Sequence, residues 1–229
     1  MKHDFRFISK KDPQVSVAYN DLMELLREVR KEIRKEYTFQ YKLVGSYSRN
    51  MITFDAKSNV GFDFDVNIYP NDDEEKFTAK DIKLIFKRAL DKWGSRHGFD
   101  DAEDSTRVLT IKIKDRKHSR VVYSVDFAFV YDYTDGNGKK RQQYIHFNKS
   151  QTQYYWEHQP DGYYELPEKI EWIKDNNLWN DMKDLYIEKK NINEDPDVHS
   201  RTIFAITVHE ICQKNGYYDD YDEEEYDDE

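Results

Sequence analysis

Residues 43–68 of the chain, LVGSYSRNMITFDAKSNVGFDFDVNI, join a turn of small residues to a strand pattern that contains two acids. The second half, FDFDVNI, alternates apolar and polar residues, which predicts a strand with its apolar side chains on one face. Asp63 and Asp65 then share the opposite face. Because neighbouring half-buried carboxylates repel one another, this pattern predicts a hard cation such as Mg²⁺ or Mn²⁺ between them.

The first half of the same stretch predicts an anion site. Residues 39–44 read as a strand that stops at Gly45-Ser46. A glycine lets a phosphate approach the backbone, and Ser46 adds a hydroxyl donor beside the free N–H groups of the turn. A triphosphate held there would share its oxygens with cations bound by Asp63 and Asp65.

A third acid lies further along the chain, within residues 121–130, VVYSVDFAFV. Asp126 is the only charged residue of this run. A single carboxylate among so many apolar neighbours is costly to bury without a partner. Its neighbours on the same face of the expected strand, Ser124 and Ala128, are small and leave room for a metal and a phosphate.

The ordered set of Gly45-Ser46, Arg49, the Asp63-Phe64-Asp65 strand and Asp126 resembles the polymerase-beta-like nucleotidyltransferase superfamily, over residues 37–132. The resemblance implies an α/β (α+β) fold, with a mixed β-sheet flanked by helices. It implies that the three acids are catalytic and hold two Mg²⁺ (or Mn²⁺) ions, and that Gly45, Ser46 and Arg49 bind the nucleotide. The segment between Ser46 and the acid pair is long and is expected to form an extended loop over the site.

The reaction that the resemblance implies is nucleotidyl transfer. An acceptor hydroxyl attacks the α-phosphate of a nucleoside triphosphate, ATP or another, and pyrophosphate leaves. Asp126 would also help to accept the proton of the acceptor. The acceptor itself is not identified by the sequence; a small molecule, a nucleotide or a protein is favoured over RNA.

Other interpretations of these residues stay open. A Gly-Ser pair is commonly an ordinary turn, and an Asp-x-Asp strand can be the solvated face of a sheet. The chain could therefore be a catalytically silent, antitoxin-like module that binds a partner. A metal-dependent glycosyltransferase also uses an Asp-x-Asp pair, but here the pair comes too early in the chain to follow a nucleotide-binding half.

Composition limits the partners. The 229-residue chain has a net charge of −10, and residues 219–229 alone hold nine acids, so the rest of the chain is close to neutral. A nearly neutral body disfavours a long nucleic-acid footprint. The basic clusters at residues 112–120 and 139–141 read as solvated hairpin ends or as contacts to phosphate or acceptor.

Nothing in the sequence suggests export or a membrane. The single cysteine, Cys212, excludes an internal disulfide. The amino terminus lacks the apolar segment of a signal peptide, and no apolar run reaches membrane-spanning length. We therefore expect a cytoplasmic protein with no membrane partner.

The expected organisation has three parts: a nucleotidyltransferase-like core over residues 1–150, a helical appendage docked on it over 151–216, and a disordered acidic tail over 217–229. Helices are expected from Asp12-Pro13, from Thr78, over about 166–191 with an interruption near Asn176-Asn177, and over about 198–215. Residues 108–113 and 120–131 should form a hairpin, residues 142–147 an edge strand or a capping ribbon, and residues 154–158 a loop.

Overall fold

The computed structural model describes residues 3–58, 61–72, 75–160, 162–195 and 197–217. It divides into two compact units, and each is described by itself below. The core unit is Arg6–Gln159, and the helical unit joins Met1–Phe5 to Pro160–Glu229. The division between the two units falls at Pro160.

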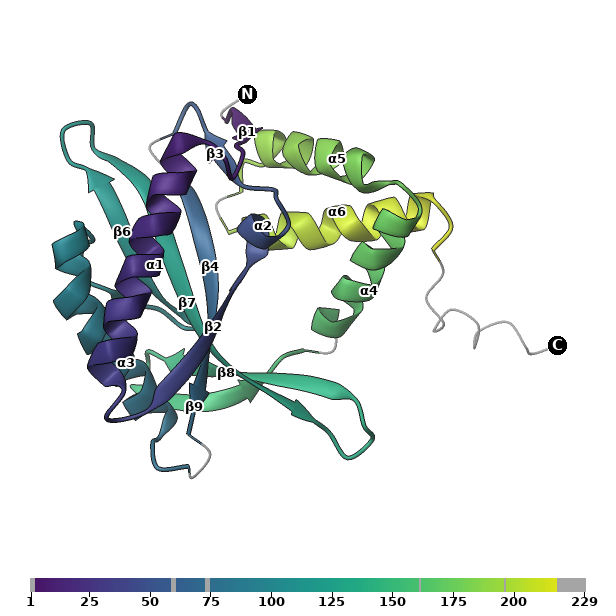
Figure 1. Ribbon diagram of the computed structural model, residues 1–229. Coiled ribbons are helices and arrows are strands. Elements are labelled where there is room, and N and C mark those ends of the chain that lie inside the picture. The colour runs from purple at the N-terminus through teal and green to yellow at the C-terminus, as the bar shows by residue number, and fades with distance from the viewer. Residues whose placement is uncertain (1–2, 59–60, 73–74, 161, 196, 218–229) are drawn as a thin grey trace. The chain divides into compact units, whose positions relative to one another are not determined.

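The core unit is built on a mixed sheet of seven strands (Figure 1). Along the main path the order is β2-β4-β7-β6-β5, and β8 and β9 extend it from the far end of β7. β4 and β7 run parallel, and the other pairs are antiparallel. The seven strands are β2 (Thr38–Val44), β4 (Phe62–Asn71), β5 (Glu103–Asp104), β6 (Val108–Asp115), β7 (Arg120–Thr134), β8 (Lys140–Asn148) and β9 (Gln153–His158).

Helices α1 (Pro13–Ile33) and α3 (Ala79–Gly94) pack against each other and cover one face of this sheet (Figure 1). Both begin at caps that the sequence predicts. The Asp12 side chain accepts a hydrogen bond from the backbone of Gln14, and Thr78 forms a reciprocal capping box with Asp81. A 3-10 turn, η1 (Ser95–His97), follows α3 and ends at Gly98.

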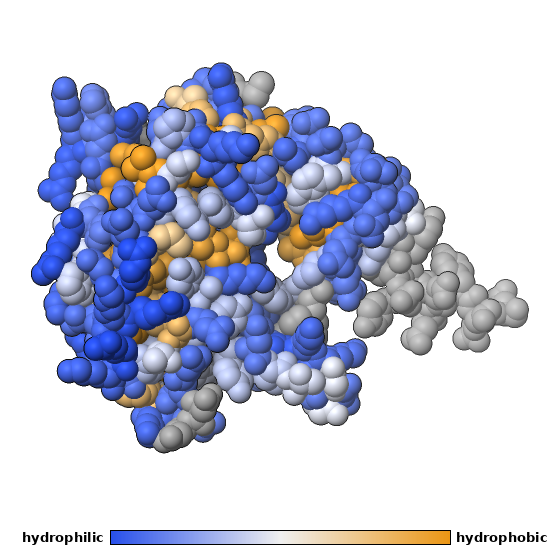
Figure 2. All heavy atoms as spheres, in the orientation of Figure 1, coloured by the Kyte–Doolittle hydropathy of each residue, from blue (hydrophilic) through white to orange (hydrophobic). Residues whose placement is uncertain are grey.

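The hydrophobic core lies between these helices and the sheet. Strand β4 gives it alternate residues, so Phe62, Phe64, Val66 and Ile68 are buried and the acids between them point to the other face. Strand β7 does the same with Tyr123, Val125, Phe127 and Phe129. The alternation predicted for both strands is confirmed. Figure 2 shows hydrophilic residues over most of the surface visible in that view.

The prediction of a loop at residues 154–158 is wrong, because these residues form β9. Tyr154 stacks on Phe147 of β8 at 4.2 Å between ring centroids, and its hydroxyl donates to Asp104 at 2.8 Å. Aromatic residues favour a pleated, half-buried surface, and in β9 Tyr154 and Trp156 are half-buried while Tyr155 between them is exposed. The core unit therefore continues past residue 150 to Gln159.

The prediction of one extended loop between Ser46 and the acid pair is also wrong. The segment begins with a short helix, α2 (Gly45–Ser48), and then forms β3 (Thr53–Asp55), which pairs with β1 (Phe5–Phe7). Met51 and Ile52 are almost completely buried, so apolar burial holds this segment in place. Residues 59–60, which lead into β4, lie outside the described residues.

The helical unit consists of α4 (Gly162–Asp175), α5 (Trp179–Ile192) and α6 (Ser200–Lys214). Tyr186 of α5 packs edge-on against Phe204 of α6, and Phe5 is held to α5 by two hydrogen bonds with Asn191. Helix α4 starts before the predicted Leu166-Pro167 and includes Pro167.

In helix α6, Ile203, Phe204, Val208 and Cys212 are buried, while Ile206 is 49% exposed. Of the expected tail, residues 218–229 lie outside the described residues. Docking of the helical appendage on the core stays a prediction.

Candidate functional site

The acids predicted from the sequence lie on the sheet face opposite α1 and α3. In the parallel pairing of β4 with β7, Asp65 is directly opposite Asp126, and Asp63 is opposite Ser124. Residues opposite each other on neighbouring strands have side chains on the same face, with backbones about 4.8 Å apart. Asp63, Asp65 and Asp126 therefore share one face at the centre of the sheet.

The Gly-Ser turn meets this face at Asp65. In the antiparallel pairing of β2 with β4, Val44 is opposite Asp65, so Gly45 follows beside that carboxylate. Gly45 has φ +64°, and a Cβ atom at this position would lie 1.8 Å from Asp65 Oδ2. Only glycine combines this left-handed backbone with so close an approach. Gly45 therefore makes room for the Asp65 carboxylate.

Ser46 and Arg49 belong to the same compact turn. The Ser46 carbonyl accepts from the backbone N–H of Met51 at 2.9 Å, and the N–H of Arg49 donates to the Gly45 carbonyl at 3.3 Å. The Ser48 hydroxyl also donates to Gly45, at 2.9 Å. The backbone of the turn is thus internally bonded, and it carries Ser46 immediately after the residue that contacts Asp65.

The carboxyl group of Asp126 has a perturbed pKa. Burial raises the pKa of its carboxyl group, and the negative charge of Asp63 raises it further. The Thr110 hydroxyl opposes this shift by donating to Asp126 Oδ1 at 2.6 Å. A half-buried acid whose pKa is raised by a second carboxylate is a common feature of functional sites.

A lysine, Lys112, lies on the same sheet face as Asp63, two strands away. Ser124 is opposite Asp63 on one side and Lys112 on the other. The Lys112 ammonium pairs with Glu103 at 2.6 Å, and its charge lowers the pKa of Asp126. The Lys112 ammonium near the three acids is therefore held in place by Glu103.

The basic cluster at residues 112–120 is largely neutralised by ion pairs. Lys114 and Arg116 both pair with Asp100, at 2.6 and 3.1 Å, and Arg120 pairs with Asp115 at 3.2 Å. In the second cluster Arg141 pairs with Asp135 at 2.9 Å. These pairs favour the interpretation of solvated hairpin ends.

In the described part of the chain, no group of three or more His, Cys, Asp or Glu side chains is arranged to hold a metal ion by itself. The carboxylate oxygens nevertheless have the chemistry that Mg²⁺ and Mn²⁺ prefer. Mg²⁺ is commonly held by one or two carboxylates together with substrate phosphates, so a complete cage made by protein alone is not required.

Sequence reasoning missed two residues of this site. Thr110 is opposite Asp126 in the β6–β7 pairing, and the alternation of residues 108–113 already puts it on the polar face of that strand. Tyr47 packs against the core from within α2, and nothing in the sequence pattern distinguishes it from the many other tyrosines.

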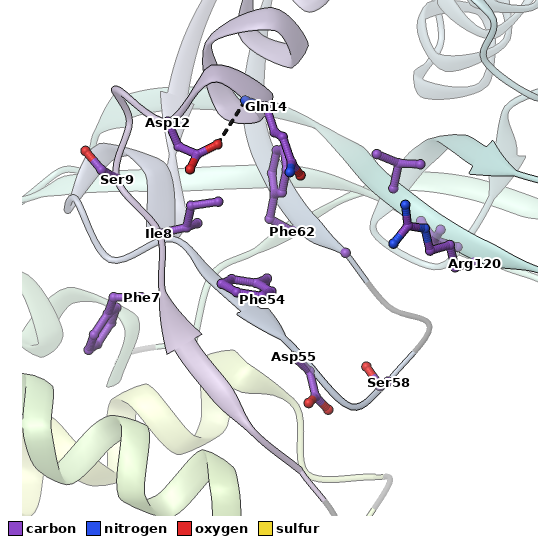
Figure 3. Close-up of a pocket in the computed structure, with 13 residues that line it drawn as sticks. Phe7, Ile8, Ser9, Asp12, Gln14, Phe54, Asp55, Ser58, Phe62 and Arg120 are labelled. Carbon is purple, nitrogen blue, oxygen red and sulfur yellow. Dashed lines mark hydrogen bonds between the residues drawn. The ribbon is translucent and has the colours of Figure 1, made fainter. Parts of the chain in front are cut away.

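A separate pocket of about 390 Å³ lies at the start of β4 (Figure 3). Phe54, Asp55 and Phe62 line it together with Gln14 and Arg120. Phe62 and Asp63 are consecutive in β4, so their side chains point to opposite faces. The pocket, with Asp55 in its lining, therefore lies on the Phe62 side of β4, whereas Asp63 and Asp65 point to the other side.

Comparison with known proteins identifies the fold. No protein-family model and no curated protein matches the chain. Among solved structures, Vibrio cholerae DncV in its 3'-deoxy ATP bound form matches with a TM-score of 0.56 and 16% identity, over 93% of this chain and 55% of DncV. The CdnE cyclic dinucleotide synthase of Elizabethkingia meningoseptica, solved with GTP and Apcpp, matches with a TM-score of 0.52 and 14% identity, over 83% of this chain and 67% of CdnE.

A third solved structure gives the same result. The STING-associated CdnE c-di-GMP synthase of Capnocytophaga granulosa matches with a TM-score of 0.51 and 18% identity, over 91% of this chain and 64% of that protein. The chain thus spans between about half and two thirds of these proteins. The predicted α+β class is confirmed, and the chain shares the fold of these solved nucleotide-bound structures and synthases.

No helix among the described residues has the length and apolar character to cross a bilayer.

Proposed function

Because the chain has the fold of the polymerase-beta-like nucleotidyltransferases, we propose that it transfers a nucleoside monophosphate from a nucleoside triphosphate to an acceptor hydroxyl. The observation that carries this proposal is that Asp65 lies next to both Asp126 and Gly45. Asp65 lies opposite Asp126 in the sheet, and its carboxylate rests on the backbone of the Gly-Ser turn. One carboxylate thus joins the proposed metal site to the proposed phosphate site.

Asp63, Asp65 and Asp126 would hold two Mg²⁺ or Mn²⁺ ions. The observation that supports this ligand set is the raised pKa of Asp126, since the charge of Asp63 and burial both disfavour its ionised form and a bound cation would relieve both. When bound, such ions lower the pKa of an acceptor hydroxyl and neutralise charge on the triphosphate.

The chain's own residues have distinct parts in the reaction. Gly45 and Ser46 hold the β- and γ-phosphates, and Arg49 assists them. The acceptor oxygen forms a bond to the α-phosphorus, the bond from that phosphorus to the β-phosphate oxygen breaks, and pyrophosphate leaves. Asp126 receives the acceptor proton.

The acceptor that we favour is the hydroxyl of a second nucleotide. Two of the three solved neighbours described above are named as synthases of cyclic dinucleotides.

The test is to incubate the protein with each labelled nucleoside triphosphate, singly and in pairs, with Mn²⁺ or Mg²⁺. We expect a product of two joined nucleotides by mass spectrometry. If product forms only after cell extract is added, the proposal of nucleotidyl transfer stands, but the acceptor is a component of the extract and not a second nucleotide. Absence of both transfer and metal-dependent triphosphate binding would instead favour the partner-binding module.

A further inference from the structure

The α2 turn is held in place although its own residues are only partly buried. None of its four residues is fully buried, yet the turn must present Ser46 at a fixed point. One point of attachment is Gly45, whose backbone lies against the Asp65 carboxylate. The other is the side chain of Tyr47, which packs against the hydrophobic core.

The partly buried Tyr47 ring contacts groups from three different parts of the core unit. It stacks on Tyr19 of α1 with centroids 5.4 Å apart and an interplanar angle of 7°. It tilts against Phe64 of β4 at 5.3 Å, and the Lys10 ammonium lies 4.5 Å from its centroid. Stacked and tilted aromatic pairs and a cation over a ring face are each attractive arrangements.

Phe64 connects this packing to the acids. It lies between Asp63 and Asp65 in β4 and points to the opposite face. Tyr47 therefore contacts the strand that carries the acid pair, while Gly45 contacts one of the acids directly. Ser46 lies between these two attachments, and its carbonyl is bonded to Met51.

We propose that Tyr47 is a positioning residue: by locking α2 onto α1 and β4, its ring fixes Ser46 relative to the acid pair. The effect on nucleotide binding rests on the proposed function, whereas the effect on the turn does not. The role depends on the shape and stacking of the ring. Phenylalanine at this position should therefore preserve the position of Ser46, and alanine should not.

The experiment compares Tyr47→Phe, Tyr47→Ala and Phe147→Ala by amide hydrogen exchange. Phe147 is a matched control because it also stacks on a tyrosine, Tyr154 at 4.2 Å, and has a lysine near its ring, with Lys83 at 5.8 Å. In Tyr47→Ala we expect exchange of the Arg49 and Met51 amides to rise about tenfold or more, since local opening governs their protection. Tyr47→Phe and Phe147→Ala should leave these two amides near wild type.

A second readout is triphosphate affinity with Mn²⁺, measured by equilibrium dialysis. Tyr47→Ala should weaken binding about tenfold, Tyr47→Phe should bind within about threefold of wild type, and Phe147→Ala should bind normally, because only the first loosens the turn. Unchanged protection of Arg49 and Met51 in Tyr47→Ala, or an equal loss in Phe147→Ala, would overturn the proposal. A wild-type protein that binds no triphosphate would refute the proposed function, and the exchange data would still decide the part played by Tyr47.

Discussion

Replacing Gly45 with alanine tests how tightly the turn and the acid pair are fitted together. The backbone there has φ +64°, and the new Cβ would lie 1.8 Å from Asp65 Oδ2 and 2.6 Å from its Cγ. The left-handed backbone costs an alanine about 1–2 kcal/mol. Moving Asp65 or the turn out of the way should add about 1–3 kcal/mol, the usual range for overpacking. We therefore expect Gly45→Ala to lower the free energy of unfolding by about 2–5 kcal/mol in total.

Gly138→Ala is the matched control for this change. Gly138 has φ +76°, and nothing lies within 4 Å of its added Cβ, so it carries only the backbone term. Urea unfolding followed by tryptophan fluorescence gives both values. Adding Asp65→Ala removes the Oδ2 and Cγ overlaps, leaves only a 3.0 Å contact with Cβ, and should bring most of the Gly45→Ala penalty down towards that of Gly138→Ala. Equal penalties for the two glycines in the wild-type background would refute the close fit between Gly45 and Asp65.

Three further changes test the surroundings of the acids. Asp126→Asn should raise the free energy of unfolding at pH 7, because the folded state raises the pKa of this carboxyl and so disfavours its ionised form. The gain should shrink as the pH falls from the raised folded pKa to the ordinary value near 4, as measured by urea unfolding across that window. Thr110→Val should lower nucleotidyl transfer about tenfold while Thr110→Ser stays within about threefold, because only serine keeps the donor to Asp126; equal rates would contradict the positioning by Thr110. Lys83→Met should lower the free energy of unfolding by about 3 kcal/mol, since it leaves Asp104 without its buried partner at 2.7 Å; a neutral result would show that this ion pair contributes little.

The elements that carry a clear period could be predicted from the sequence. The alternation in FDFDVNI put Asp63 and Asp65 on one face, and a single acid in an apolar run singled out Asp126. Pairing then brings Asp65 opposite Asp126, which alternation alone does not determine. The caps at Asp12 and Thr78 were equally readable, because their side chains bond to backbone only two or three residues away.

What could not be predicted depends on contacts between distant segments. Strand β3 is only three residues long and forms by pairing with β1, and β9 becomes a strand by pairing with β8. Thr110 and Asp126 meet only once β6 and β7 are in register. Tyr47 likewise acquires its role from Tyr19 and Phe64, which lie on other elements. Local pattern contains no information on such pairings.

The most direct measurement of the central claim follows two labels through one reaction. The protein is incubated with Mn²⁺ and a nucleoside triphosphate labelled at either the α- or the γ-phosphate, beside Asp65→Asn and Asp126→Asn. We predict that the α-label of the donor enters a joined product, that the γ-label of the donor leaves in pyrophosphate while a nucleotide acceptor keeps its own, and that both variants lose the reaction. Transfer of the γ-label to an acceptor, or undiminished α-label transfer by both variants, would contradict the assignment of this face of the sheet to nucleotidyl transfer.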